Sequence, residues 1–160
     1  MNKIIYKPIG IIHSPFLKPG NMPIQPAAAL GIRGQIVIDE EYTEGLSDLE
    51  GFSHMYLIYH FHLSVSFKLR VIPFLDNRKR GVFSTRAPKR PNAIGLSVVR
   101  LIDINANILD IENVDIIDGT PLLDIKPYVQ EMEAVDHYRT GWLSSRTQEI
   151  KSKNSDNRFK

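Results

Sequence analysis

Short apolar runs rich in Ile and Val recur along the chain, and Gly, Pro, Asn or Asp separates one run from the next. Runs of this length and composition are typical of β-strands rather than helices. The pattern predicts eight strands, the seventh with a bend or divided in two, over residues 4–12, 31–38, 54–63, 69–74, 81–86, 94–104, 108–117 and 122–128.

Helical periodicity is limited to two short windows, residues 43–49 and 130–139. Neither window is long enough to provide the crossover helices of repeated βαβ units, so the pattern excludes a doubly wound parallel sheet. We therefore expect an all-β fold, a small single-sheet β-barrel with short helical turns and long loops. The longest irregular segment, residues 14–34, has four prolines and three glycines, and we expect it to be functional.

The composition fits one soluble globular domain, because 42% of the 160 residues are hydrophobic and 24% are charged. No apolar run reaches the roughly 18 residues of a membrane helix, and the first residues lack a signal-peptide core. We expect a cytoplasmic protein with no membrane partner. The absence of cysteine excludes disulfide scaffolds, thiolate nucleophiles and cysteine zinc sites, so any catalysis uses other side chains or a bound cofactor.

Charge is strongly segregated although the formal net charge is only +2. Residues 68–90 include eight basic residues and one acidic residue, Asp76, whereas residues 39–50 and 103–124 each have six acidic residues and no basic one. Aromatic residues, prolines and glycines interrupt the basic run, which indicates an ordered surface rather than a disordered arm. A solvated face is the simple interpretation, and a surface for a phosphate backbone is the functional one.

The segment HMYLIYHFHL, residues 54–63, alternates strictly, so Met55, Leu57 and Tyr59 should face the core. The opposite face then carries His54, Tyr56, Ile58, His60 and His62. A metal-dependent phosphoesterase using the three histidines is one hypothesis, but no carboxylate or third ligand stands at a recognisable spacing. We expect no metal and a histidine that hydrogen-bonds a ligand or a carbonyl group.

Two further segments combine rigid turns with polar groups. In the sequence RGVFSTRAPKRPNAIGLS, residues 80–97, prolines bracket two cations beside Asn92, which suits either anion binding or a rigid turn. In DGTPLLDIKPY, residues 118–128, a turn precedes a strand whose alternate residues Asp124, Lys126 and Tyr128 share one face. Motifs of dinucleotide-binding, P-loop, zincin and serine hydrolase enzymes are absent from the sequence.

These two segments, together with FSHMYLIYHFH at residues 52–62, closely resemble the TsaA-like family, also called the TrmO family. PIGIIHSPF at residues 8–16 and PIQPAA at residues 23–28 are similar to its opening strand and cofactor loop. The resemblance implies a TsaA-like β-barrel, which we assign to residues 1–141. Residues 142–160 lose the strand pattern and include five basic residues, so we expect a basic, flexible tail there. It also implies a dimer that binds S-adenosylmethionine and methylates the exocyclic N6 of threonylcarbamoyladenosine next to the tRNA anticodon.

Carried over from the family, the S-adenosylmethionine contacts fall on Gln25, Pro26, Ala27, His62, Leu63, Arg86, Leu96, Asp118, Gly119, Thr120 and Pro121. The basic run provides the candidate tRNA contacts Arg78, Lys79, Arg80, Lys89 and Arg90. Candidate catalytic residues, which would stabilise charge on the acylated nitrogen, are Arg86, Arg90, Asn92, Lys126 and Tyr128. The alternative function is a non-catalytic RNA-binding β-barrel, and Arg86 has the alternative role of pairing with Asp118 to hold two loops together.

Overall fold

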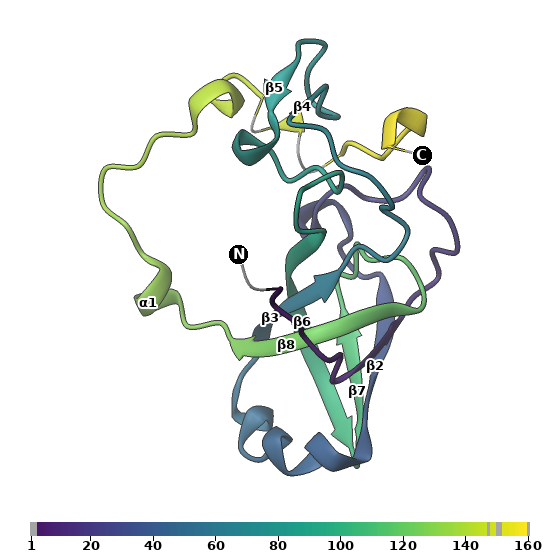
Figure 1. Ribbon diagram of the computed structural model, residues 1–160. Coiled ribbons are helices and arrows are strands. Elements are labelled where there is room, and N and C mark those ends of the chain that lie inside the picture. Colours follow the sequence, from purple (N-terminus) through teal and green to yellow (C-terminus); the bar gives the residue numbers. More distant parts are fainter. Residues whose placement is uncertain (1–2, 147, 150–151, 160) are drawn as a thin grey trace.

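Six antiparallel strands close into a barrel in the order β1-β2-β7-β6-β3-β8, in a computed structural model that describes residues 3–146, 148–149 and 152–159 (Figure 1). The strands of the barrel are β1 Gly10–His13, β2 Arg33–Ile38, β3 His54–His60, β6 Ile94–Asn105, β7 Ile108–Glu112 and β8 Thr120–Pro127. The predicted all-β barrel is therefore confirmed. Within the described residues, no helix is long and apolar enough to cross a membrane.

β6 holds the barrel together because it changes neighbour along its 12 residues. Its first half pairs with β3, from His60 opposite Ile94 to His54 opposite Arg100. Its second half pairs with β7, with a register shift between Leu101 and Asp103. Irregularities of this kind bend a strand, which lets β6 curve around the barrel.

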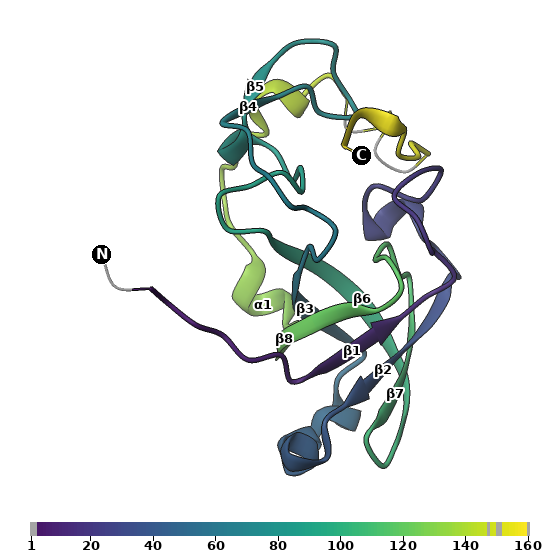
Figure 2. The same cartoon turned by 45° about the vertical axis from the view of Figure 1, so that its right-hand side comes forward.

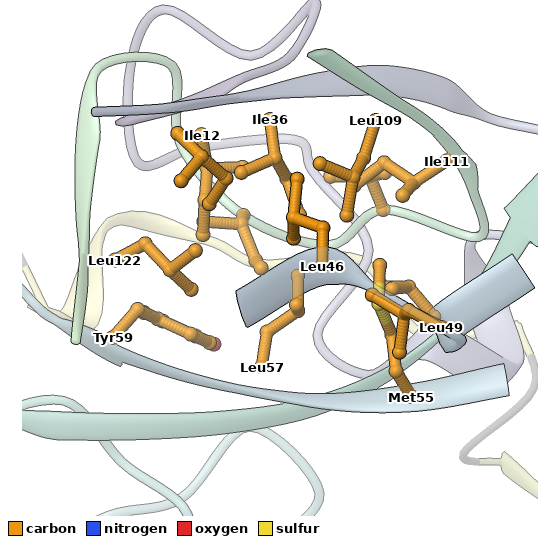
Figure 3. Close-up of a cluster of buried hydrophobic side chains, with 14 residues drawn as sticks. Ile12, Ile36, Leu46, Leu49, Met55, Leu57, Tyr59, Leu109, Ile111 and Leu122 are labelled. Carbon is orange, nitrogen blue, oxygen red and sulfur yellow. The ribbon is translucent and has the colours of Figure 1, made fainter. Parts of the chain in front are cut away.

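The barrel interior is filled by the alternating side chains that the sequence pattern predicts. Met55, Leu57 and Tyr59 of β3 are buried as expected. Figure 3 shows Leu49 beside Met55 at one end of this cluster and Tyr59 beside Leu122 at the other. Leu49 comes from the short helix η3 Leu49–Gly51, which with η2 Glu40–Leu46 covers that end of the barrel.

Two predicted strands are much shorter than expected. β4 Arg70–Val71 and β5 Arg80–Gly81 form a separate two-stranded sheet outside the barrel. The prediction of a strand over residues 81–86 is wrong, because the chain turns into the 3₁₀ helix η4 Val82–Ser84. The guanidinium of Arg90 binds the carbonyl oxygens of this turn, and those groups are therefore not available to a neighbouring strand.

The first predicted strand also begins later than expected, at Gly10 instead of residue 4. β1 pairs with β2 and β8, and Gly10 lies opposite the last residue of β2, Ile38. Without partners on either side, Ile4 and Ile5 are 75% and 80% exposed. Their apolar character predicted a strand here, but among the described residues no neighbouring strand pairs with them.

The remaining short helices lie in loops and in the C-terminal part, as η1 Pro26–Ala28, α1 Gln130–Glu133, η5 Gly141–Leu143 and η7 Asn157–Phe159. The described residues of the segment 142–159 contact two different loops. Ser155 exchanges backbone hydrogen bonds with Asn21 and Met22, and Arg158 donates to the carbonyl oxygens of Pro73 and Asp76. Figure 2 shows this end of the chain between the β4–β5 sheet and the loop at residues 14–34. The flexibility expected for residues 142–160 stays a prediction, and residues 147, 150, 151 and 160 lie outside the described part.

The close approach of β3 and β6 leads to a stability prediction at Gly95. A Cβ atom on this residue would lie 2.2 Å from the ring of Tyr59, which is itself packed in the core. Gly95→Ala should therefore lower the free energy of unfolding by about 1 to 3 kcal/mol, as overpacking does. Chemical denaturation measures the change. The matched control is Gly45→Ala, because a Cβ atom at Gly45 has nothing within 4 Å, and equal losses in both variants would contradict the prediction.

Candidate functional site

A cavity of about 700 Å³ opens at the end of the barrel where β3 ends and β6 begins. Residues of the loop 14–34, the segment 85–90, the turn 115–120 and the C-terminal residues 155–159 line it. Its walls are mainly apolar, with Phe61, Ile116 and Leu96 among them. A concave apolar cavity with a few polar groups is the usual form of a small-molecule site.

Arg86 and Gln25 form the main polar contact on one wall of the cavity. Arg86 Nη1 donates a 2.9 Å hydrogen bond to Gln25 Oε1, which joins residues from two segments far apart in the sequence. Asp118 does not pair with Arg86, so the predicted Arg86–Asp118 alternative is wrong. Asp118 accepts hydrogen bonds from the Ser14 amide at 3.0 Å and from His13 at 3.1 Å, and these lower the pKa of its carboxyl.

His62 and Thr120 provide a second polar pair on the wall. The Thr120 hydroxyl donates to the Ile117 carbonyl oxygen at 2.7 Å, so it accepts from His62 Nδ1, which lies 3.3 Å away. Burial and the neighbouring His60 lower the pKa of His62. The lowered pKa favours the neutral form of the His62 ring. Its partner in the structure is a hydroxyl group, so the predicted hydrogen bond to a ligand or a carbonyl group stays a prediction.

A row of three polar side chains lies at the inner side of the cavity. Tyr59 Oη is 3.1 Å from Ser97 Oγ, and Ser97 Oγ donates to Asp115 Oδ1 at 2.7 Å. Because the Ser97 hydrogen is used toward Asp115, Tyr59 is the donor to Ser97. Burial raises the pKa of Asp115 to about 6, although the Ser97 hydrogen bond and the nearby Arg86 oppose the shift.

The predicted cofactor residues fall into two groups. Those that line the cavity are Gln25, His62, Leu63, Arg86, Leu96 and Thr120. The other five do not line the cavity but are close in sequence to residues that do. They are Pro26, Ala27, Asp118, Gly119 and Pro121. Gly119 supports the turn, where its φ of +72° suits glycine and its amide donates to the Ile12 carbonyl. Cofactor binding by all of these residues stays a prediction.

The candidate catalytic residues are not all in one place. Arg86 and Arg90 line the cavity, but Arg90 Nη1 binds three carbonyl oxygens, those of Val82, Thr85 and Ala87, at 2.8 to 3.4 Å. Asn92 is exposed beyond the loop. Lys126 forms an ion pair with Asp124, and Tyr128 packs against Tyr56 with ring centres 5.6 Å apart, and neither residue lines the cavity.

The basic run also divides by environment. Arg80 forms an ion pair with Asp76 at 2.7 Å, which lowers the pKa of Asp76. The guanidinium of Arg80 also lies over the Trp142 ring. Arg90 is held by the carbonyl groups described above, and Lys89 is half-buried. Arg78 and Lys79, at the β4–β5 connection, are exposed. Of the five predicted tRNA contacts, these two have the side chains most accessible to a large partner.

Sequence reasoning missed the row formed by Tyr59, Ser97 and Asp115 and the C-terminal lining residues Ser155, Asp156 and Phe159. One local signal was present, because Gly95 and Ser97 occupy inward positions of β6 where large apolar residues are expected. A small and a polar residue at such positions indicate a close approach and a buried hydrogen bond.

The cavity suits the cofactor that the resemblance implies. S-adenosylmethionine has a flat adenine, a ribose, a carboxylate and two cationic groups. The cavity offers apolar walls, the exposed guanidinium of Arg86 and two carboxylates, those of Asp115 and Asp156. Its volume lies within the usual range for ligand sites of this size. Among the described side chains, no group of three or more His, Cys, Asp or Glu is arranged to hold a metal ion.

Comparison with known families decides the relationship. The sequence profile of the tRNA-methyltransferase O N-terminal domain matches residues 11–134. The chain belongs to this family. The match covers every strand of the barrel except the first residue of β1, and it includes the cavity-lining residues from Lys18 to Thr120. The family predicted from the sequence is therefore confirmed.

Relatives in the family share both sequence and fold. A probable S-adenosyl-L-methionine-binding protein of Pyrococcus abyssi is 53% identical over 98% of this chain and 85% of its own length. The human tRNA (adenine(37)-N6)-methyltransferase is 39% identical over 82% of this chain, but only 31% of the human protein is covered. The crystal structure of TrmO from Pseudomonas aeruginosa has a TM-score of 0.74 at 38% identity, over 88% of this chain and 63% of that one. The chain thus spans less than two thirds of these two larger proteins.

The raised pKa of Asp115 predicts a pH-dependent gain in stability when its charge is removed. The unfolded chain ionises this carboxyl near pH 4, whereas the folded protein keeps the proton up to about pH 6. The ionised group therefore costs stability that increases between these values and is complete above pH 6. Asp115→Asn should raise the free energy of unfolding by on the order of 2 kcal/mol at pH 8 and by little at pH 4. Denaturant unfolding at both pH values measures this, and an equal gain at both would contradict it.

Proposed function

We propose that this protein is an S-adenosylmethionine-dependent tRNA methyltransferase that methylates the exocyclic N6 of threonylcarbamoyladenosine next to the anticodon. The observation that carries the proposal is the cavity of about 700 Å³, whose apolar walls hold Arg86 and Asp115 as groups of opposite charge. The names of the relatives state S-adenosylmethionine binding and adenine methylation. We also propose that the protein acts in the cytoplasm, a location that fits a tRNA-modifying enzyme.

The side chains of the cavity mainly bind and align. S-adenosylmethionine supplies an already activated methyl group when bound, so the protein has to place that group in line with the attacking nitrogen. Phe61, Leu96 and Ile116 provide walls that exclude water. Arg86 is exposed at the wall and held by Gln25, so its guanidinium is placed to bind the methionine carboxylate or to stabilise charge on the acylated nitrogen.

A methylation assay tests the proposed function. Purified protein is incubated with S-adenosylmethionine carrying a labelled methyl group and with tRNA that does or does not carry threonylcarbamoyladenosine, and the nucleosides are then separated. Label should appear on the modified adenosine only. Binding of both ligands without label transfer would support the non-catalytic RNA-binding barrel instead. Label on unmodified adenosine would contradict the proposed substrate.

Arg86→Ala is the variant that connects this function to the cavity. A charge-assisted hydrogen bond to a ligand contributes about 1.5 to 3 kcal/mol, so S-adenosylmethionine should bind about ten- to a hundredfold more weakly. The unfolding temperature without cofactor should stay nearly unchanged, because the Arg86 side chain is exposed. Calorimetric titration and thermal unfolding measure the two effects. A lower unfolding temperature with unchanged affinity would give Arg86 a structural role only.

Substitutions at the predicted tRNA contacts should have two kinds of effect, on tRNA binding or on stability. Replacing Arg78 or Lys79 by Ala should weaken tRNA binding and reduce the slope of affinity against salt by about one counterion each, because both side chains are exposed. Arg80→Ala and Arg90→Ala should instead lower the unfolding temperature, since these side chains hold Asp76 and three carbonyl groups. Binding measured between low and moderate salt tests this. An unchanged slope in the Arg78 and Lys79 double variant would move the tRNA surface elsewhere.

We also propose that the protein is a homodimer with its interface at the cavity rim. Leu63 and Leu96 line the cavity yet are 51% and 47% exposed, and Val65 nearby in the chain is 96% exposed. Light scattering should give twice the mass of one chain at micromolar concentration. Val65→Glu should shift the mass toward the monomer. Ile108→Glu, on the β6–β7 hairpin, should not, and a monomeric wild-type protein would overturn the proposal.

A further inference from the structure

Asp115 is one of two half-buried acids that have no basic partner among the described residues, and it is the one that lines the cavity. The other, Asp110, accepts a hydrogen bond from the Gln35 amide. By contrast, Asp76 is paired with Arg80 and Asp118 with His13. The Asp115 carboxylate accepts from neutral donors, the Ser97 hydroxyl at 2.7 Å and its own backbone N–H.

The position of Asp115 makes this lack of a partner informative. The carboxylate lines the cavity at its inner side, beside Tyr59 and Ile116 of the core. A charge in such a place is costly unless an opposite charge neutralises it. The charge of Arg86 lowers the pKa of Asp115, but the hydrogen bond that its Nη1 donates goes to Gln25. The position next to Asp115 in the cavity therefore favours a ligand cation.

We propose that Asp115 binds a cationic group of S-adenosylmethionine, either the sulfonium or the α-ammonium, while Arg86 binds its carboxylate. The inference rests on the proposed function, which supplies the cofactor. Both cationic groups belong to the methionine part of the molecule, and both suit a carboxylate. Asp115 would then be a binding residue at the reacting end of the cofactor.

Ser97 and Tyr59 are positioning residues for Asp115. Hydroxyl groups donate in one direction along the row, from Tyr59 to Ser97 and from Ser97 to Asp115 Oδ1. The ring of Tyr59 lies against the backbone of Gly95, so its hydroxyl has little freedom to leave Ser97. This arrangement fixes the carboxylate before the ligand arrives, which reduces the entropy lost on binding.

The two cationic groups have different consequences for the product. Methyl transfer breaks the bond from sulfur to the methyl carbon and forms the bond from nitrogen to that carbon, so the sulfonium becomes a neutral thioether and the nitrogen loses a proton. A carboxylate at the sulfonium would bind the cofactor more tightly than S-adenosylhomocysteine. A carboxylate at the α-ammonium, which the product keeps, would bind both equally.

Calorimetric titrations of S-adenosylmethionine and S-adenosylhomocysteine into the full chain at pH 7.5 test the inference. Asp115→Asn should weaken binding of S-adenosylmethionine by about ten- to a hundredfold. The matched control is Asp103→Asn, an exposed acid on the second half of β6, which should bind like the wild type. Ser97→Ala should give a smaller loss, because the carboxylate stays but is less well held.

The pH profile of cofactor affinity, measured for the wild type and for Asp115→Asn, provides a second test. Affinity should decrease as the pH falls below about 6, because protonation removes the Asp115 charge. The other titratable or charged groups that line the cavity are Lys18, Tyr59, His62, Arg86, Arg90 and Asp156. Burial and the neighbouring His60 shift the pKa of His62, one of these groups, below its usual value. Asp115→Asn retains His62, so the difference between the two profiles belongs to Asp115.

Each outcome has one meaning. Weaker binding of S-adenosylmethionine alone supports contact with the sulfonium, and weaker binding of both ligands supports contact with the α-ammonium. Unchanged or tighter binding of S-adenosylmethionine by Asp115→Asn, or identical pH profiles for both proteins, overturns the inference and leaves the proposed function intact. A wild-type protein that binds neither ligand overturns the proposed function and the inference with it.

Discussion

The barrel closes through strands that change their pairing along their length. β6 pairs with β3 near its beginning and with β7 near its end, and the register shift between Leu101 and Asp103 lets it turn from one neighbour to the other. A second register shift lies between Ile58 and Tyr59, where β3 pairs with β8. Closure of the six strands therefore depends on irregular pairing at two places. It also places the beginning of β6, with Gly95 and Ser97, at the open end of the barrel, directly beside the ligand site.

At that end of the barrel, inward positions carry an aromatic, a small and a polar residue instead of large aliphatic side chains. Large aliphatic side chains fill the barrel from Met55 to Leu57, but the next inward position of β3 is Tyr59 and the facing residues of β6 are glycine and serine. The small residues make room for the aromatic ring and give its hydroxyl a partner. Polar groups replace apolar ones where the core meets the cavity, so the same side chains close the end of the core and form the inner side of the cavity.

Much of the barrel could be predicted from the sequence, because alternation is a local property. The segment that became β3 shows it clearly, while short apolar runs predicted β2, β6 and β8, and the predicted centres of all four agree with the structure. The predicted strand at 81–86 failed because the side chain of Arg90, a few residues farther along the chain, binds the carbonyl groups there. No pattern in those residues indicates that a guanidinium farther along the chain will shape them.

The candidate site shows the same limit. Resemblance to the family supplied Gln25, Arg86 and Leu96, which line the cavity, because motifs preserve residue identity and spacing. Asp115 is read from sequence as one more acid in an acidic stretch. It becomes distinctive only when the fold brings it to Ser97, 18 positions away in the chain.

The C-terminal segment has a consequence for how this end of the molecule moves. Ser155 is hydrogen-bonded to Asn21 and Met22, while Arg158 reaches the carbonyl groups of Pro73 and Asp76, so two loops that are distant in sequence are joined by a third piece of chain. Loops tied in this way open as one cooperative unit. Amide hydrogens of Asn21 and Ser155 would then exchange with solvent at a common rate, set by the loss of the whole cluster rather than by fraying of either loop.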